Sequence, residues 1–291
     1  MNDEEYTYLK RKIHRLLNID LDGYKDHQMK RRLDALIART QAPGVAAYCK
    51  TLESDRELCQ KLRDFLTINV SEFFRDADQY KILRTRILPD LMKNSPRLNI
   101  WSAGCSNGSE PYSIAMILEE TASYHRHRIL ATDLDVGILA KARAGGPYVP
   151  SDVRNVDKSL LSKYFKKVED DYWVDDRIKQ RVEFKQHNLL MGPFEKDFDL
   201  IICRNVVIYF ADDAKRKLYR GFCDSLKDNG VFFMGGTETM LGVYDLKFEK
   251  ICASFHRKCA DGEKVRPGAK RTPLEAKERG DRIASNSRQV R

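Results

Sequence analysis

Apolar residues in the first sixty-odd positions recur with the period of an α-helix. One apolar stripe runs through residues 6–17 and a second through residues 29–37. Two further short helices are predicted in PGVAAYCKTL and SDRELCQKLRDFLTI, and in the latter Ser54 and Glu57 have the spacing of a capping box. Four helices of this length predict a small N-terminal helical domain over residues 1–66.

The pattern changes after this domain. One more amphipathic helix is expected around Tyr80, Leu83 and Ile87, ended by Pro89. Beyond it, the strand-length apolar runs LNIWSA, RILATD, FDLIICRN and GVFFMGG alternate with the helical segments EPYSIAMILEE, DVGILAKARAG and DDAKRKLYRGFCDSL. This alternation predicts an α/β fold with a parallel, Rossmann-like sheet. A polar insertion at about residues 164–186 predicts a small antiparallel β excursion.

Composition narrows the class of protein. The chain has 291 residues, of which 42% are hydrophobic and 33% charged, as in ordinary globular proteins. It contains no run of eighteen apolar residues and begins without a signal-peptide pattern, so we expect a cytoplasmic protein with no membrane insertion. Its seven cysteines lack C-x-x-C spacing and its six histidines are dispersed, which predicts neither disulfides nor a metal site.

The net charge of +9 indicates an acidic partner, which could be nucleic acid, a membrane surface or an acidic protein. Part of this charge lies in residues 259–291, where nine Lys and Arg stand against five Asp and Glu. This stretch is rich in Gly, Pro and Ser, and we expect a disordered basic tail.

A glycine-containing turn, SAGCSNGSE, joins the first strand of the alternating region to its helix. In doubly wound sheets, ligands bind at this corner, and Gly104 and Gly108 would let the backbone approach one closely. The spacing is not G-x-G-x-x-G, which disfavours a dinucleotide, and a plain strand-to-helix turn remains an alternative.

Two acids extend this hypothesis. Asp133 ends the next strand, where a carboxylate can accept both hydroxyls of a ribose, although it could also cap the following helix, a role open to Asp135 as well. Glu110 stands where the first helix begins, so it would repel a phosphate and attract a cation. A cationic nucleoside points to S-adenosyl-L-methionine, with Glu110 serving its positive end.

These segments resemble the CheR-type chemotaxis receptor methyltransferases, from about Leu9 to Lys258. The similar motifs are TINVSEFFRD, IWSAGCSNGSEPYS, ILATDLD, HNLL, FDLIICRNVVIYF and GVFFMGGTE; Ser109 stands where the family usually has a second acid. The resemblance implies an S-adenosylmethionine-dependent methyltransferase sheet over residues 67–258, with a β insertion at about 164–186. It also implies methyl transfer to receptor glutamates, with S-adenosyl-L-homocysteine as product, in sensory adaptation.

The resemblance also implies a set of cofactor-binding residues. By this resemblance the amide of Asn188 hydrogen-bonds to the edge of the adenine and Leu189 packs on the face of the ring. Asn188 taken alone could also be an ordinary turn residue. The full set consists of Asn69, Ser71, Arg75, Glu110, Asp133, Asn188, Leu189, Arg204 and Asn205.

Catalysis by this route demands little of the protein, because a glutamate acceptor is already ionised at neutral pH and needs no general base. Arg75 can fork onto the acceptor carboxylate and Tyr209 can donate a hydrogen bond to it, so we expect both to be catalytic. Core packing is the alternative for Tyr209.

Basic residues in the helical domain suggest how an acidic partner is recruited. Lys30, Arg31 and Arg32 are consecutive, and we expect them to contact the acidic methylation helices in the cytoplasmic domains of chemoreceptors; a simply solvated helix face is the alternative. In some family members the β insertion grips a peptide at the receptor C-terminus, and this use is open here.

Two other functions fit parts of the sequence. A nucleic-acid methyltransferase fits the basic charge, but an exocyclic-amine acceptor usually comes with an Asn/Asp-Pro-Pro-aromatic corner, and this chain reads CRNVVIYF there. No nucleic-acid module is visible, so nucleic acid is not expected as a partner. A non-catalytic protein that senses S-adenosylmethionine and binds receptors is the second alternative, against which Arg75 and Tyr209 argue.

Overall fold

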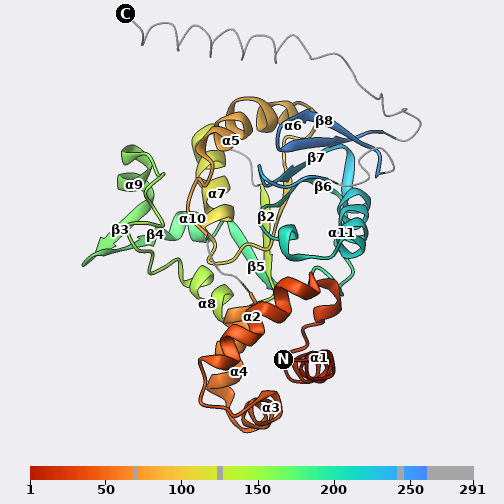
Figure 1. The fold of residues 1–291 in the computed structure, drawn as a ribbon. Helices are drawn as coiled ribbons and strands as arrows, with labels where there is room; N and C mark the ends of the chain where they lie inside the picture. The colour runs from red at the N-terminus through yellow and green to blue at the C-terminus, as the bar shows by residue number, and fades with distance from the viewer. Residues whose placement is uncertain (68–70, 123–126, 241–245, 261–291) are drawn as a thin grey trace, which may run out of the picture.

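A computed structural model describes residues 1–67, 71–122, 127–240 and 246–260. The N-terminal helices form a separate layer beneath the sheet in Figure 1, with the last of them reaching toward it. Their shared core is built on the predicted stripes, with Leu9, Ile13 and Leu33 completely buried. The helices are α1 (Asp3–Leu17), the 3₁₀ turn η1 (Leu21–Gly23), α2 (Asp26–Ala38), α3 (Val45–Ser54) and α4 (Arg56–Leu66).

The predicted capping box at the start of α4 is wrong by one residue. Ser54 is the last residue of α3, and Asp55 is the N-cap of α4, accepting a hydrogen bond from the backbone N–H of Leu58 at 2.9 Å. The charged carboxylate of Asp55 stabilises the positive end of the helix better than a neutral hydroxyl can.

The predicted helix stop at Pro89 is also wrong. A continuous helical segment runs through α5 (Ala77–Ile82), the π-helical turn η2 (Leu83–Ile87) and α6 (Leu88–Asn94), with Pro89 in the first turn of α6. In the π turn the N–H of Leu88 bonds to the carbonyl of Leu83, five residues back. Such a turn shifts the hydrogen-bond ladder, so a proline that lacks an N–H can be accommodated without ending the helix.

Within the described residues, the central sheet has seven strands in the order β5-β2-β1-β6-β7-β9-β8. The first five of these are parallel, and β9 and β8 are antiparallel, so the predicted α/β fold is confirmed, with two antiparallel strands at the end that the sequence did not predict. The strands are β1 (Asn99–Ala103), β2 (Arg128–Asp133), β5 (Val182–Gln186), β6 (Phe198–Cys203), β7 (Leu226–Met234), β8 (Phe248–Cys252) and β9 (Phe255–Lys258).

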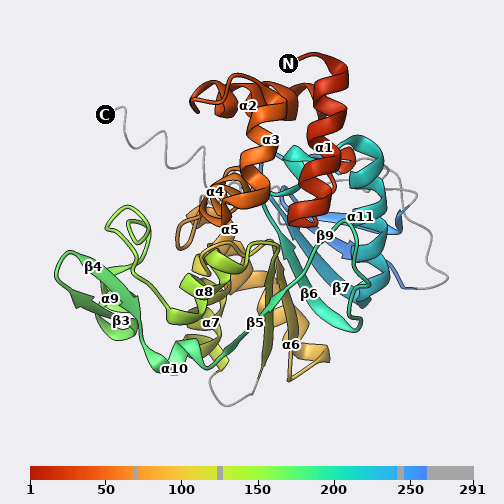
Figure 2. The ribbon, with the colours of Figure 1, turned by 90° about the horizontal axis from the view of Figure 1, so that it is seen from below.

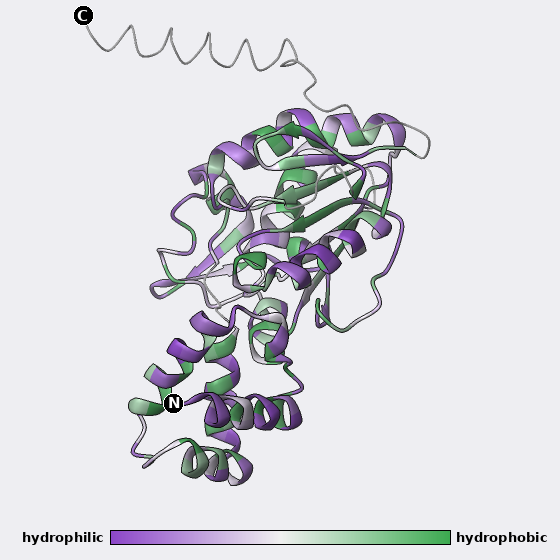
Figure 3. Cartoon of the chain, turned by 45° about the vertical axis from the view of Figure 1, so that its right-hand side comes forward, coloured by the Kyte–Doolittle hydropathy of each residue, from purple (hydrophilic) through white to green (hydrophobic). Residues whose placement is uncertain are grey.

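Helices cover both faces of the sheet (Figure 2). Alternate strand residues point to opposite faces: Ile100 joins the core beneath α7 (Ser109–Ala122) and α8 (Val136–Ala144), and Trp101 joins the core beneath α11 (Asp212–Ser225). Figure 3 shows the same division, with hydrophobic strands in the centre and hydrophilic stretches along the outer helices. Both cores therefore depend on the period of two along buried strands.

The polar insertion is smaller than predicted. Only β3 (Phe165–Val168) and β4 (Asp171–Val174) form the antiparallel pair, which lies between α9 (Lys158–Tyr164) and α10 (Asp176–Lys179) and projects to the side in Figure 1. The remainder of the predicted range, residues 182–186, is β5, which pairs in parallel with β2. Each of the three strands has one buried residue at an end and otherwise exposed or half-buried residues, so only the pairing partner distinguishes β5 from β3 and β4.

Candidate cofactor and active site

A cavity opens at the carboxyl ends of β1, β2 and β6, where the chain order in the sheet reverses. Ligands of open α/β sheets bind at such a switch point. Tyr24, from the helical domain, closes one side of the cavity. Every predicted cofactor or catalytic residue that the structure describes lies in its lining: Ser71, Arg75, Glu110, Asp133, Asn188, Leu189, Arg204, Asn205 and Tyr209. Asn69 lies outside the described residues.

The glycine turn after β1 is fixed to the end of β2. The N–H groups of Gly104 and Cys105 both donate to the carbonyl of Thr132, at 2.8 and 2.9 Å. Gly104 has a φ of +83°, and a Cβ there would lie 2.6 Å from the Cγ2 of Val206. Glycine is therefore required so that the turns after β1 and β6 can pack together at the cavity wall.

Asp133 and Asp135 have different tasks. One oxygen of Asp135 accepts hydrogen bonds from the N–H groups of Gly137 and Ile138, so Asp135 caps α8. Asp133 lines the cavity and accepts from the N–H groups of Ser106 and Asp135, at 2.8 and 3.1 Å. Burial raises the pKa of Asp133, and these N–H donors oppose the rise. A carboxylate oriented in this way can still accept further hydrogen bonds from a ligand hydroxyl.

Glu110 and Arg204 form the charged floor of the cavity. Oε1 of Glu110 accepts from the Ser102 hydroxyl at 2.8 Å, and its Oε2 lies 3.8 Å from Nη1 of Arg204. Burial raises the pKa of Glu110, and the positive charge of Arg204 opposes that rise. The side chain of Arg204 is only 2% exposed and also donates to Asp76 at 2.6 Å and to the carbonyl of Arg75 at 3.0 Å. Arg204 thus braces the turn that carries Arg75.

The turn after β5 brings Asn188 and Leu189 to the cavity. The side-chain oxygen of Asn188 accepts a hydrogen bond from the N–H of Leu190 at 3.0 Å. Asn188 therefore stabilises this turn, which is the alternative role that the sequence left open for it. Its carboxamide NH₂ has no partner among the described residues. An amide donor and an apolar side chain thus stand next to each other on this wall, as an aromatic base requires.

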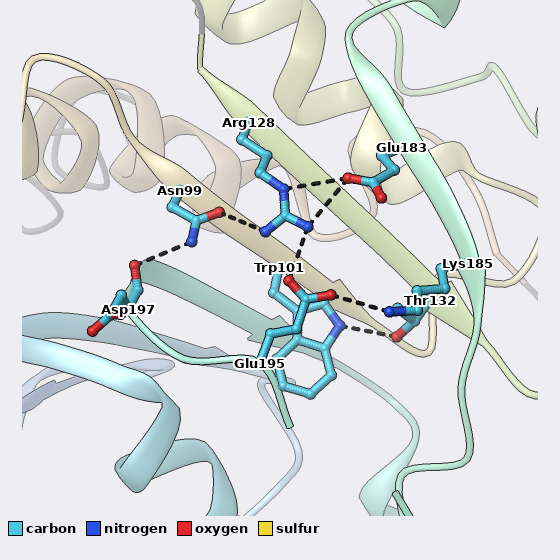
Figure 4. A network of polar contacts seen from close by, with 8 residues as sticks. All are labelled: Asn99, Trp101, Arg128, Thr132, Glu183, Lys185, Glu195 and Asp197. Atoms are coloured by element: carbon cyan, nitrogen blue, oxygen red, sulfur yellow. Dashed lines mark hydrogen bonds and ion pairs between the residues drawn. The ribbon is translucent and has the colours of Figure 1, made fainter. Parts of the chain in front are cut away.

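A polar network holds the rest of this segment against the sheet (Figure 4). Glu195 pairs with Arg128 of β2 at 2.9 Å and with Lys185 of β5 at 3.3 Å, and Arg128 also contacts Glu183 at 3.2 Å. The segment 187–197 is therefore anchored at its far end as well as at the cavity.

The helical domain covers the cavity, a contribution that the sequence did not reveal. Tyr24 packs edge-on against Phe210 with the ring centroids 5.2 Å apart, and burial raises its pKa to about 12. The N–H of Lys25 donates to the carbonyl of Tyr209 at 3.1 Å, and the N–H of Ala211 to the carbonyl of Gly23 at 2.8 Å. No motif marks Tyr24, because its role depends on two segments nearly 190 residues apart.

The three consecutive basic residues do not share a surface. Lys30 pairs with Asp3 at 2.7 Å. Arg31 is exposed, while Arg32 lies over the Phe65 ring, 4.7 Å from its centroid, and donates to the Phe65 carbonyl. Consecutive helical residues project about 100° apart, so the expectation that all three form one receptor-facing patch is not supported by this geometry.

The arrangement is that of an S-adenosylmethionine-dependent methyltransferase: a mostly parallel sheet, with acids and a glycine turn at its switch point and helices on both faces. The chain belongs to the CheR methyltransferase family. The family model "CheR methyltransferase, SAM binding domain" matches residues 69–255, and "CheR methyltransferase, all-alpha domain" matches residues 4–67. S-adenosyl-L-methionine is the methyl donor, and the protein is a methyltransferase of chemotaxis.

Individual relatives agree with this assignment. A chemotaxis protein methyltransferase of Listeria monocytogenes is 37% identical over 244 residues, covering 84% of this chain and 93% of the relative. One from Borreliella burgdorferi is 34% identical over 259 residues, covering 84% of this chain and 91% of the relative. In the described residues no helix is long and apolar enough to cross a membrane, and no cluster of three or more potential metal ligands occurs.

Proposed function

We propose that the cavity holds S-adenosyl-L-methionine through the residues that line it. Asn188 and Leu189 take the adenine, Asp133 the ribose hydroxyls and Glu110 the positive end of the methionyl portion. The buried hydroxyl of Ser106 has no partner among the described residues and borders the cavity, so a polar ligand group would satisfy it. When bound, the cofactor supplies a methyl group on a cationic sulfur.

The acceptor in this proposal is a glutamate carboxylate of a chemoreceptor. Arg75 and Tyr209 line the same cavity as the acids, and this observation carries the proposal. The Tyr209 hydroxyl has no hydrogen-bond partner in the described part of the chain and can donate to the acceptor. The acceptor carboxylate is already ionised, so Arg75 and Tyr209 need only align it with the methyl group. The helical domain that covers the cavity needs only to exclude water.

The basic side chains of the helical domain indicate the surface on which the receptor would bind. The acidic methylation helices of the receptor would approach the exposed Arg31, with Lys30 and Arg32 contributing to the positive field around it. The β3–β4 pair is available for a receptor C-terminal peptide, and the reaction takes place in the cytoplasm, where those receptor segments lie.

The test is incubation of the protein with radiolabelled S-adenosylmethionine and bacterial membranes. We expect label in a receptor-sized band as a base-labile ester, and loss of that label when the receptor glutamates are replaced by alanine. Base-stable label, or label in RNA, would instead favour the nucleic-acid alternative. Binding of the cofactor with no transfer would favour a non-catalytic sensor.

A further inference from the structure

A second groove runs along α11. It has a volume of about 620 Å³, and its α11 wall includes Asp213, Lys217, Gly221 and Asp224. These positions repeat at helical spacing over almost all of α11, which corresponds to a length of about 20 Å. The opposite wall comes from η1 and the 189–196 segment.

The groove has a tightly packed apolar floor. A Cβ on Gly221 would lie 2.4 Å from Cε2 of Phe194, and one on Gly23 would lie 2.6 Å from Cδ1 of Leu190. The glycines therefore allow the 189–196 segment to sit directly against both α11 and η1. Such contacts make the groove a preformed surface.

Its rim is predominantly acidic. Asp22 pairs with Lys10 at 2.5 Å, but Asp20, Asp213 and Asp224 form no ion pair within the described part of the chain. An acidic receptor helix would be repelled here, and a basic peptide would be attracted. The charged residues lining the groove are Asp20, Asp22, Asp213, Asp224, Lys196 and Lys217.

The chain itself supplies a peptide of this kind. Residues 264–271, KVRPGAKR, contain four basic residues and no acidic one. The described chain ends at Ala260, and just before it the Lys258 ammonium donates to the carbonyl of Leu226 at 2.7 Å. Leu226 directly follows Ser225, which lines the groove. Four further residues span up to about 14 Å, so residue 264 can reach this end.

We propose that residues 264–271 dock in the groove along α11 as an extended basic peptide. Eight extended residues span about 26 Å, which is enough to follow the groove from Asp224 toward Asp213. The attraction comes from the acidic rim, while the short linker after Ala260 keeps the peptide at a high effective concentration beside its site. Docking fills an apolar floor that would otherwise face water.

Hydrogen–deuterium exchange of the full chain, read by mass spectrometry, tests this contact. At low salt we expect the amides of residues 264–271 to exchange at least about threefold more slowly than in an unstructured peptide of the same sequence. High salt should remove the protection, because the Debye length falls from about 30 Å at 0.01 M to about 3 Å at 1 M. Reversing the charge of the groove rim with Asp213→Lys and Asp224→Lys should remove the protection of residues 264–271 even at low salt.

The matched control reverses two exposed acids outside the groove, Asp170→Lys and Glu249→Lys, and should keep the protection. Adding Lys264→Glu and Lys270→Glu to the groove variant should restore it. Affinity for S-adenosylhomocysteine within about twofold of wild type, by calorimetry, verifies that each variant is folded. Exchange of residues 264–271 at the unprotected rate in the wild type, equal protection in groove and control variants, or protection only after receptor is added would each overturn the proposal.

Discussion

The pair formed by Arg204 and Glu110 gives the sharpest test of how the site is built. At 3.8 Å, and with an effective dielectric constant of about 20, their attraction is about 4 kcal/mol. Replacing Arg204 by methionine keeps much of its volume but leaves Glu110 buried without its cation. Because removal of one partner from a buried pair typically costs about 3–5 kcal/mol, we expect a loss of about 3 kcal/mol of unfolding free energy at pH 7. Asp76, at 51% exposed, adds little because water screens it.

Urea denaturation followed by the fluorescence of buried Trp101 measures this loss. Two further results are expected. The loss should shrink as the pH falls, since Glu110, whose pKa burial raises, then takes up a proton and no longer needs the cation. Adding Glu110→Gln should recover about 2 kcal/mol, because the uncompensated charge is gone.

Arg204→Lys is the matched control, retaining the charge while losing the fork that reaches Asp76 and the Arg75 carbonyl. It should be less destabilised than Arg204→Met and should still bind S-adenosylmethionine more weakly than wild type, because the turn carrying Arg75 loosens. A loss below about 1 kcal/mol in Arg204→Met, or one that does not change with pH, would refute the view that this pair balances a buried charge.

Four further outcomes are expected. Tyr209→Phe should lower kcat by at least about tenfold with S-adenosylmethionine affinity unchanged, and equal turnover would remove it from catalysis. Affinity for S-adenosylmethionine, measured by calorimetry, should fall as the pH drops through the raised pKa of Glu110. This fall should begin at a higher pH than it would for a glutamate with an ordinary pKa, and Glu110→Gln should abolish the pH dependence. Gly104→Ala should lower the unfolding free energy by about 2 kcal/mol or more, because Gly104 has a positive φ and the new Cβ would meet Val206. Gly44→Ala should lower it less, because the space around its Cβ is open. Arg31→Glu should slow receptor methylation most at low salt, and a salt-independent loss would contradict steering.

Three residues at the cavity, Gly104, Glu110 and Asp133, were identified from the sequence because their positions follow from local rules. A glycine turn after one parallel strand and an acid at the end of the next must meet, since the carboxyl ends of parallel strands share one edge of the sheet. Gly104, Glu110 and Asp133 are therefore predictable from strand pattern and spacing alone. The roles of the remaining lining residues came through the resemblance and stand as proposals.

Other features were decided only by tertiary packing. The brace from Arg204 to Asp76, the cover by Tyr24 and the separation of Lys30 from Arg32 each depend on which distant surface a side chain meets. The π turn before Pro89 likewise follows from how that helix packs rather than from local propensity. Periodicity records which face of an element is buried, and it carries no information about the partner against which that face is buried. For this protein the sequence determined where the chemistry gathers, and the packing of the helical domain on the sheet decided how it is enclosed.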